Sequence, residues 1–245
     1  MYKGKLILAI IPARKGSKRI PRKNVRKLNG VPLVTYTINS AKKSKYIDRI
    51  VVSTDDIRVA KIAKKHKIEV LKRSKKLSED HILPIQVYEN VANELKKKEH
   101  YLPDIIVALQ PTSPLREGKD IDLAITTLVD KNADSLDSFS RAKEHPSYAF
   151  KIDDNMNAIP IDKKNVAKMS QYLPKRYTEN GLVFAFKTET ITKHKTQYGK
   201  IHKAIITDYE KSIDIDEEID WKLAELILKK RKKNRLRNLF KKIRG

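Results

Sequence analysis

The chain has 245 residues, of which 40% are hydrophobic and 34% charged, so it can bury one large core. It contains no cysteine, which excludes disulfides, thiolate metal sites and cysteine nucleophiles and fits a reducing cytoplasm. A net charge of +24 would suit nucleic acid, but base-stacking aromatic residues are not interleaved with the charge, so we expect no nucleic-acid partner.

Strands and helices alternate in the first part of the chain. The apolar run at residues 6–13 predicts a strand buried on both faces, and it is too short for a signal sequence or a membrane span. Further strands are expected at residues 49–53, 69–71, 104–109 and 135–140, and helices at residues 33–41, 57–66, 84–98 and 121–129. This order predicts an α/β fold with a mainly parallel sheet flanked by helices, in a cytoplasmic protein.

The alternation fails at about residues 141–179. A turn at Asp153–Asn155 between short apolar segments predicts a small β-rich insert there. Later strands are expected at residues 181–186 and 204–207, and a long helix from Glu217. We therefore divide the chain into one domain at residues 1–228, with the insert inside it, and a C-terminal tail.

The tail, residues 229–245, is strongly basic. It contains ten Lys or Arg residues and no acidic residue, which leaves a net charge of +14 for the rest of the chain. Leu236, Leu239, Phe240 and Ile243 lie among these charges, and this pattern allows a weak contact between an amphipathic helix and a membrane surface.

A cationic loop follows the first strand. Residues 10–26 read I-I-P-A-R-K-G-S-K-R-I-P-R-K-N-V-R and carry seven Lys or Arg side chains. Ligands of open α/β sheets bind beyond the carboxyl ends of the strands, so this loop is a candidate polyphosphate site. It matches neither G-x-x-x-x-G-K-[ST] nor G-x-G-x-x-G, which argues against ordinary ATPases and dinucleotide-binding enzymes.

Two further segments place polar groups at strand ends. In Q-P-T-S-P-L-R, we interpret Gln110 as a ligand contact and Ser113 as the cap of the next helix. In S-I-D-I-D, the extended backbone turns Asp214 and Asp216 to one face, where two carboxylates can bind Mg²⁺, the usual partner of a polyphosphate. The same pair would also suit the N-terminal end of the following helix.

Three motifs carry a family resemblance. I-P-A-R-K-G-S-K-R-I-P-R-K-N, L-Q-P-T-S-P-L-R and S-I-D-I-D-x-x-x-D, in this order, resemble the acylneuraminate cytidylyltransferases, the CMP-sialic acid synthetases. The resemblance extends to about residue 228. It implies a Rossmann-like nucleotidyltransferase fold, Mg²⁺ dependence and a homodimer in which the insert crosses to the partner. The implied reaction joins CTP and an acidic nine-carbon (nonulosonic) sugar to give a CMP-sugar acid and pyrophosphate.

The resemblance also implies roles for individual residues. The expected catalytic residues are Arg14, Lys23 and Asp216, and the expected Mg²⁺ ligands are Asp214 and Asp216. The expected nucleotide-binding residues are Arg14, Ser17, Lys18, Lys23, Asn24, Arg73 and Gln110. The expected sugar-binding residues are Gln110, Gln171 and Asn180.

The acceptor side departs from the sialic acid enzymes. Where they place basic residues, this chain has Tyr148, Ser170 and Thr178, so we expect Lys175 or Arg176 to supply charge for the sugar carboxylate. Legionaminic acid is therefore a competing acceptor. The alternative functions are a cytidylyltransferase for another acidic sugar such as 3-deoxy-manno-octulosonate, a nucleotide-sugar-binding glycosyltransferase, and a basic protein that binds RNA or membrane.

Overall fold

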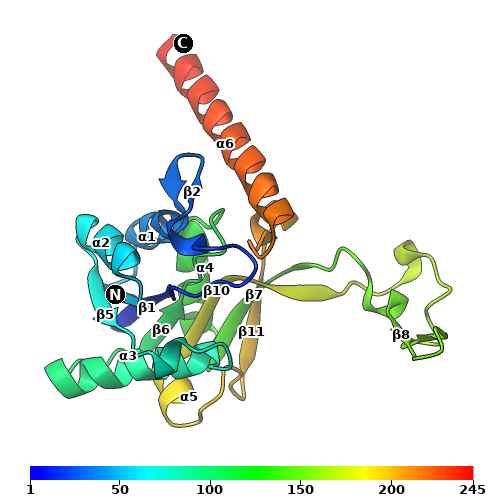
Figure 1. Ribbon diagram of the computed structural model, residues 1–245, viewed down its shortest axis with the longest axis horizontal. Coiled ribbons are helices and arrows are strands. Elements are labelled where there is room, and N and C mark those ends of the chain that lie inside the picture. The colour runs from blue at the N-terminus through cyan, green and yellow to red at the C-terminus, as the bar shows by residue number, and fades with distance from the viewer. Residues whose placement is uncertain (245) are drawn as a thin grey trace.

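A seven-stranded sheet lies at the centre of the computed structural model, which describes residues 1–244 and the side chains of residues 1–234 (Figure 1). Its strands are β1 (Ile7–Pro12), β4 (Arg49–Thr54), β5 (Glu69–Lys72), β6 (Ile105–Ala108), β7 (Ser135–Arg141), β10 (Tyr177–Lys187) and β11 (His202–Ile206). The strand order is β11-β7-β10-β6-β1-β4-β5, and neighbours are parallel except that β10 is antiparallel to β6 and β7. The predicted mainly parallel sheet is confirmed.

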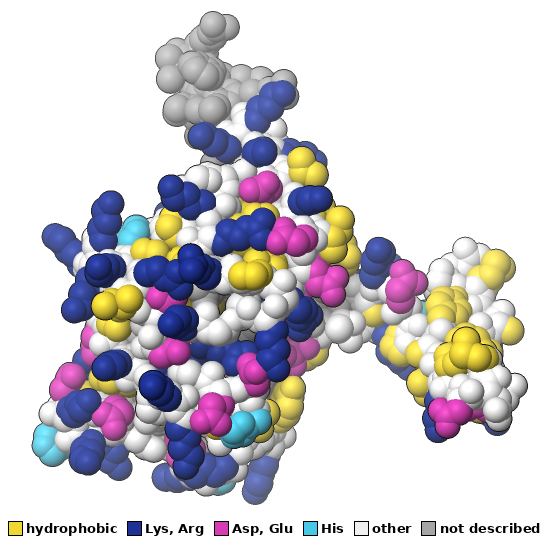
Figure 2. Space-filling model, in the orientation of Figure 1, with side chains coloured by type: hydrophobic (Ala, Val, Ile, Leu, Met, Phe, Trp, Pro, Cys, Tyr) yellow, Lys and Arg dark blue, Asp and Glu magenta, His cyan; other side chains and the backbone are white. Residues whose placement is uncertain are grey.

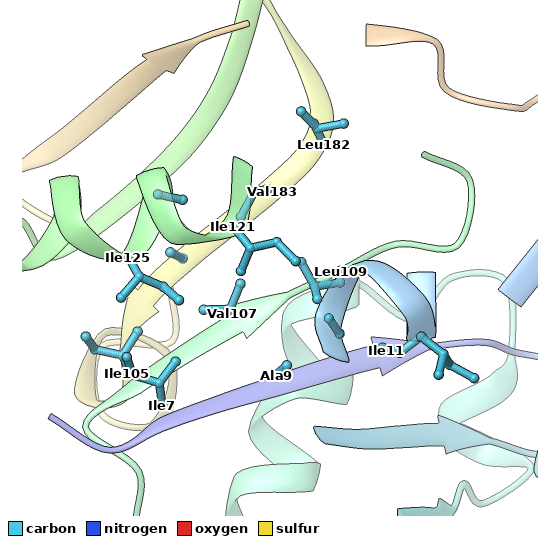
Figure 3. Close-up of a cluster of buried hydrophobic side chains, with 14 of the residues drawn as sticks. Ile7, Ala9, Ile11, Ile105, Val107, Leu109, Ile121, Ile125, Leu182 and Val183 are labelled. Carbon is cyan, nitrogen blue, oxygen red and sulfur yellow. The ribbon is translucent and has the colours of Figure 1, made fainter. Parts of the chain in front are cut away.

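Helices cover both faces of this sheet. They are α1 (Leu33–Lys42), α2 (Ile57–Lys65), α3 (Pro84–Glu99), α4 (Gly118–Asp130), α5 (Thr188–Thr192) and α6 (Glu218–Arg244). Along β1, Ile7, Ala9 and Ile11 pack with α1, α2 and α4, as Figure 3 shows for part of this cluster. Leu8 and Ile10 pack with α3 and α5 on the opposite face. The continuous apolar run of β1 is thus explained by burial on both faces.

The cationic loop lies at the carboxyl end of β1. A short 3₁₀ helix (Lys23–Val25) leads from it into the hairpin of β2 (Lys27–Leu28) and β3 (Val31–Pro32). Asn29 and Gly30 form the predicted turn at positive φ angles of 47° and 82°, which these two residue types tolerate best.

The insert forms an arm that projects from the body of the molecule (Figure 1). It carries a hairpin of β8 (Phe150–Ile152) and β9 (Ala158–Pro160), so the predicted β-rich excursion is confirmed. Its large apolar side chains are exposed to solvent (Figure 2); they include Phe150, Ile152, Met156, Ile161, Met169 and Tyr172.

The strand expected at residues 181–186 begins earlier, at Tyr177. Its register against β7 shifts between Glu179 and Phe184, and Gly181 within this bulge has a φ of 66°. The bulge interrupts the alternation of side chains, which is why the first part of β10 did not read as a strand.

Helix α6 begins one residue later than expected and continues through the basic tail. Trp221 and Ala224 pack against Ile213 and Ile215, while Arg231 donates hydrogen bonds to the backbone of Leu115 and to Glu210. The expected boundary at residue 228 therefore falls within one helix. The apolar side chains behind the membrane-contact expectation lie outside the described ones, and no helix in the described part of the chain is apolar enough over a sufficient length to span a bilayer.

Candidate active site

A cavity of about 440 Å³, hereafter the first cavity, opens at the carboxyl ends of β1 and β6. All seven residues expected to bind nucleotide line it, namely Arg14, Ser17, Lys18, Lys23, Asn24, Arg73 and Gln110. Asp216 lines it as well. The topology thus brings together side chains from segments that are far apart in the sequence.

The cationic loop is held in shape by its own polar groups. The Asn24 Nδ2 donates a hydrogen bond to the Arg14 carbonyl (2.9 Å), and the Lys15 N–H donates to an Asp55 carboxylate oxygen (2.7 Å). The Lys18 Nζ and Arg14 Nη1 each lie 2.7 Å from the Asp80 carboxylate, which is half exposed. These two cations hold the pKa of Asp80 below its usual range. The loop therefore presents cations already paired with a displaceable anion.

Arg73 enters the first cavity from the end of β5. Its Nε and Nη2 donate to the Oγ (3.2 Å) and the carbonyl oxygen (3.0 Å) of Ser53 on β4. Burial lowers the pKa of Arg73 to about 10, so the guanidinium is cationic at neutral pH. A buried, anchored cation of this kind suits a fixed contact with a charged ligand.

The two aspartates lie on one face, as the alternation predicted, because Ile213 and Ile215 are buried in the core on the other. The Lys23 Nζ contacts the Ile215 carbonyl (2.6 Å) and Asp216 Oδ1 (3.1 Å). Asp214 Oδ1 is buried without a hydrogen-bond partner among the described residues, and burial raises the pKa of Asp214. An orphaned carboxylate oxygen close to a second carboxylate fits a divalent cation.

The described residues contain no group of three or more His, Cys, Asp or Glu residues suited to a metal ion. Two carboxylates alone do not complete the coordination of Mg²⁺, which usually takes its other oxygens from water and substrate phosphates. The pair therefore fits a cation that arrives with a polyphosphate better than one bound by protein side chains alone.

A second cavity, of about 520 Å³, is lined by the end of β7, the first part of β10 and the segment that precedes α6. Gln110 lines both cavities, so the two share a wall. Asn180 also lines the second cavity: its Oδ1 accepts a hydrogen bond from Ser138 Oγ (2.7 Å) and its Nδ2 donates to Thr207 Oγ1 (2.8 Å). Asp214 is in the lining of this cavity, while Asp216 is in that of the first. The aspartate pair thus lies at the boundary between two binding spaces.

The family profile described as cytidylyltransferase matches residues 8–242. The chain belongs to the cytidylyltransferase family. The predicted resemblance is confirmed, and the protein is a CTP-dependent nucleotidyltransferase.

Several known proteins are similar to this cytidylyltransferase. Post-translational flagellin modification protein B of Campylobacter coli is 32% identical over 92% of this chain and 96% of its own. CMP-N,N'-diacetyllegionaminic acid synthase of Legionella pneumophila is 32% identical over 91% and 96%. A solved structure of CMP:2-keto-3-deoxy-manno-octonic acid synthetase complexed with CTP shares the fold, with a TM-score of 0.70 at 15% identity over 92% of this chain and 99% of its own.

Gln171, expected to bind the sugar in this cytidylyltransferase, lies outside both cavities. It is exposed in a 3₁₀ helix (Ser170–Tyr172) of the arm. Lys175 and Arg176 are also exposed and line neither cavity. The cations in the lining of the second cavity are instead Arg141 and Lys143. These two were missed because they lie in the insert boundary, where the strand pattern is weak.

The loop after β6 is organised by a residue that the sequence reasoning missed. The guanidinium of Arg116, 4% exposed, donates to the carbonyl oxygens of Leu182 and Gln110. Burial lowers the pKa of Arg116 to about 9. The sequence feature that could have identified Arg116 is its position as the last residue of the motif Q-P-T-S-P-L-R. In this cytidylyltransferase it ties the backbone between the two cavities to β10.

The capping role expected for Ser113 is wrong. Its hydroxyl donates to the Gly181 carbonyl (3.1 Å), whereas α4 begins only at Gly118. The first turn of α4 is instead closed by the Asp120 side chain, which accepts a hydrogen bond from the Glu117 N–H (2.8 Å). Ser113 thus joins two loops at the site, which a reading of local sequence does not reveal.

Proposed function

We propose that this enzyme transfers CMP from CTP to the anomeric hydroxyl of a nonulosonic sugar acid and releases pyrophosphate. The carrying observation is that Gln110 lines both a cation-rich cavity and a second cavity that contains Arg141 and Lys143. Two substrates bound in adjoining cavities can meet at this shared wall. The similarity to a CMP-N,N'-diacetyllegionaminic acid synthase of Legionella pneumophila supports a nine-carbon acceptor.

On the nucleotide side, Arg14 and Lys18 exchange the Asp80 carboxylate for the triphosphate. Both cations already lie within 2.7 Å of a carboxylate oxygen, so they are placed for anionic oxygens. Charge builds up on the α-phosphate as the acceptor hydroxyl attacks it, and positioned cations stabilise that charge. Ser17 and Asn24 complete the loop around the phosphates, and Arg73 and Gln110 contact the nucleoside.

Asp214 and Asp216 would hold Mg²⁺ beside the phosphates. When bound, the ion would neutralise charge on the triphosphate and on the leaving pyrophosphate. Lys23 fixes this segment by its contacts with the Ile215 carbonyl and Asp216. Asn180 orients the acceptor from the opposite side.

In the second cavity, where we place the sugar acceptor, Arg141 and Lys143 bind the sugar carboxylate. Neither has an ion-pair partner among the described residues, so both cations are free to meet a ligand anion. This assignment replaces Lys175 and Arg176, which lie outside the cavity.

We further propose a cytoplasmic homodimer in which the arms cross. The exposed apolar side chains of the arm, such as Met156 and Ile161, favour burial against a second copy. Gln171 would then reach the acceptor cavity of the partner rather than its own.

The test is pyrophosphate release from CTP, UTP, ATP and GTP with Mg²⁺ and each of N-acetylneuraminate, legionaminate and 3-deoxy-manno-octulosonate. We expect release with CTP and a nine-carbon acid only. Turnover confined to the eight-carbon acid would replace the proposed acceptor with the alternative one. Absence of pyrophosphate release with the whole panel, together with intact CTP binding, would overturn the proposal for these acceptors.

A further inference from the structure

The second cavity contains a carboxylate that is held from two sides. Glu179 on β10 lines this cavity, and its Oε2 accepts a hydrogen bond from the Tyr198 hydroxyl (3.1 Å) in the loop before β11. Glu179 pairs with Phe139, which is two residues from Asp137 on β7, so Glu179 and Asp137 lie on the same face of the sheet. The side chains of Asp137 and Glu179 interact across the two strands.

Asp137 is fully buried, and neither of its carboxyl oxygens has a hydrogen-bond partner of good geometry among the described residues. Burial, followed by the charge of Glu179, raises the pKa of Asp137 to about 8. The His202 Nε2 lies 3.7 Å from an Asp137 carboxyl oxygen, but burial lowers the pKa of His202 and so disfavours the cationic form that would stabilise an Asp137 carboxylate. Asp137 is therefore protonated at neutral pH, and its neutral acid lies beside the Glu179 carboxylate.

We propose that Glu179 determines acceptor specificity by accepting a hydrogen bond from an N–H or O–H group of the sugar acid, with Asp137 and Tyr198 as positioning residues. This inference rests on the proposed function and assigns the orientation of the acceptor within its cavity. A carboxylate repels the sugar's own carboxylate, which is left to Arg141 and Lys143. The hydroxyl or acylamido donors elsewhere on the sugar then face Glu179, which has lone pairs to accept them.

The polar arrangement favours a ligand over a purely structural role. Burying the neutral acid of Asp137 without a well-formed hydrogen bond costs stability, and a protein core of apolar residues would avoid that cost. Glu179 and Arg141 are diagonal neighbours on adjacent strands, yet no ion pair links them in the described structure. Glu179 is thus held in place without being neutralised by the nearest cation of the cavity.

Steady-state kinetics with the sugar acid that the wild-type enzyme uses will test this proposal. In Glu179→Ala, the KM for the sugar should rise about 10- to 100-fold while the KM for CTP stays within about 2-fold, because one hydrogen bond to a charged group is lost on the acceptor side alone. Tyr198→Phe should raise the sugar KM about 3- to 10-fold, since only a positioning hydrogen bond is removed. Glu94→Ala is the matched control, because its carboxylate pairs with Lys98 on the surface of α3.

The pH profile separates positioning from simple packing. The titratable groups around Asp137 are Glu179, His202, Tyr198 and Tyr88, from β10, β11, the preceding loop and α3. Above about pH 8 Asp137 ionises beside Glu179, so the wild-type sugar KM should rise while the KM for CTP does not. Asp137→Asn should abolish that rise.

Three results would overturn the inference. These are an unchanged sugar KM in Glu179→Ala, an equal rise in the KM for CTP, and a rise above pH 8 that persists in Asp137→Asn. A wild-type enzyme that turns over no sugar acid would overturn both this inference and the proposed function. If the wild type is active and Glu179→Ala has an unchanged KM for the sugar, this inference alone is overturned.

Discussion

A substitution at Asp216 can test the proposed Mg²⁺ site without disturbing the hydrophobic core. Its side chain is 41% exposed and contacts Lys23 and Arg19, while the neighbouring Ile215 supplies the core packing. We predict that Asp216→Asn lowers kcat at least about 100-fold with a melting temperature within a few degrees of wild type. Glu217→Gln, one residue further on and exposed, is the control. Near-normal Mg²⁺-dependent rates in Asp216→Asn would contradict the metal assignment.

Under the proposed function, Asp80 competes with the triphosphate for Arg14 and Lys18. Asp80→Asn removes the carboxylate that Arg14 and Lys18 contact, so the loop should bind the triphosphate more tightly. Exposed ion pairs are worth about 0–1 kcal/mol, and we therefore expect a fall of about 2- to 5-fold in the KM for CTP. Glu79→Gln is the control at the adjacent position. An increase in the KM for CTP would show that Asp80 instead supports the nucleotide site.

Asp137 also affects the stability of the fold. Its pKa is raised from 3.8 to about 8, so the folded protein binds the proton more tightly than the unfolded chain does. The contribution of this group to stability is therefore greatest below about pH 4 and is lost as the pH rises to about 8. We predict that Asp137→Asn raises the free energy of unfolding by about 1–3 kcal/mol at pH 8 and by less at pH 4. Urea denaturation at the two pH values measures this, and an equal effect at both would contradict it.

At the scale of elements, Arg116 joins the loop after β6 to β10. In Arg116→Met the carbonyl oxygens of Gln110 and Leu182 lose their donor inside the protein. We predict a loss of about 2–4 kcal/mol in the free energy of unfolding, measured with urea. Lys98→Met, on the surface of α3 where the ammonium group pairs with Glu94, should cost less than about 1 kcal/mol. An equal loss of unfolding free energy in the two variants would contradict the role of Arg116 in connecting the loop after β6 to β10.

At the scale of the whole molecule, the proposed homodimer depends on the arm. Met156 and Ile161 are 81% and 71% exposed, which is costly for an isolated chain but not for a pair whose arms are buried. We predict that the wild type sediments at about twice the chain mass of 28.3 kDa, and that Met156→Asp combined with Ile161→Asp yields monomers with an unchanged circular dichroism spectrum. A monomeric wild type at micromolar concentration would refute the crossed-arm dimer.

Local sequence was sufficient to predict those features in which one pattern, such as apolar periodicity, dominated. The β1 run, the alternation of Ile213 and Ile215 with Asp214 and Asp216, and the turn at Asn29 each matched the structure. Apolar periodicity decides these features, because burial on one or both faces repeats with the period of the backbone. The residues expected to bind nucleotide also gather in one cavity, because strand ends converge at one edge of a parallel sheet.

The rest was decided by tertiary structure. Three interactions join segments that no sequence period relates. They are the contact of Lys23 with Asp216, the hydrogen bond from Arg116 to the Gln110 carbonyl, and the interaction of Glu179 with buried Asp137. The first part of β10 was not predicted for the same reason. The bulge at Gly181 is a change in the register of β10 against β7, and a register is defined only between two strands. The sequence by itself therefore determined the fold class, the family and the position of the cationic loop, whose signals are local. Only the packed sheet decided which charges share a cavity, because burial and pairing arise between strands rather than along them.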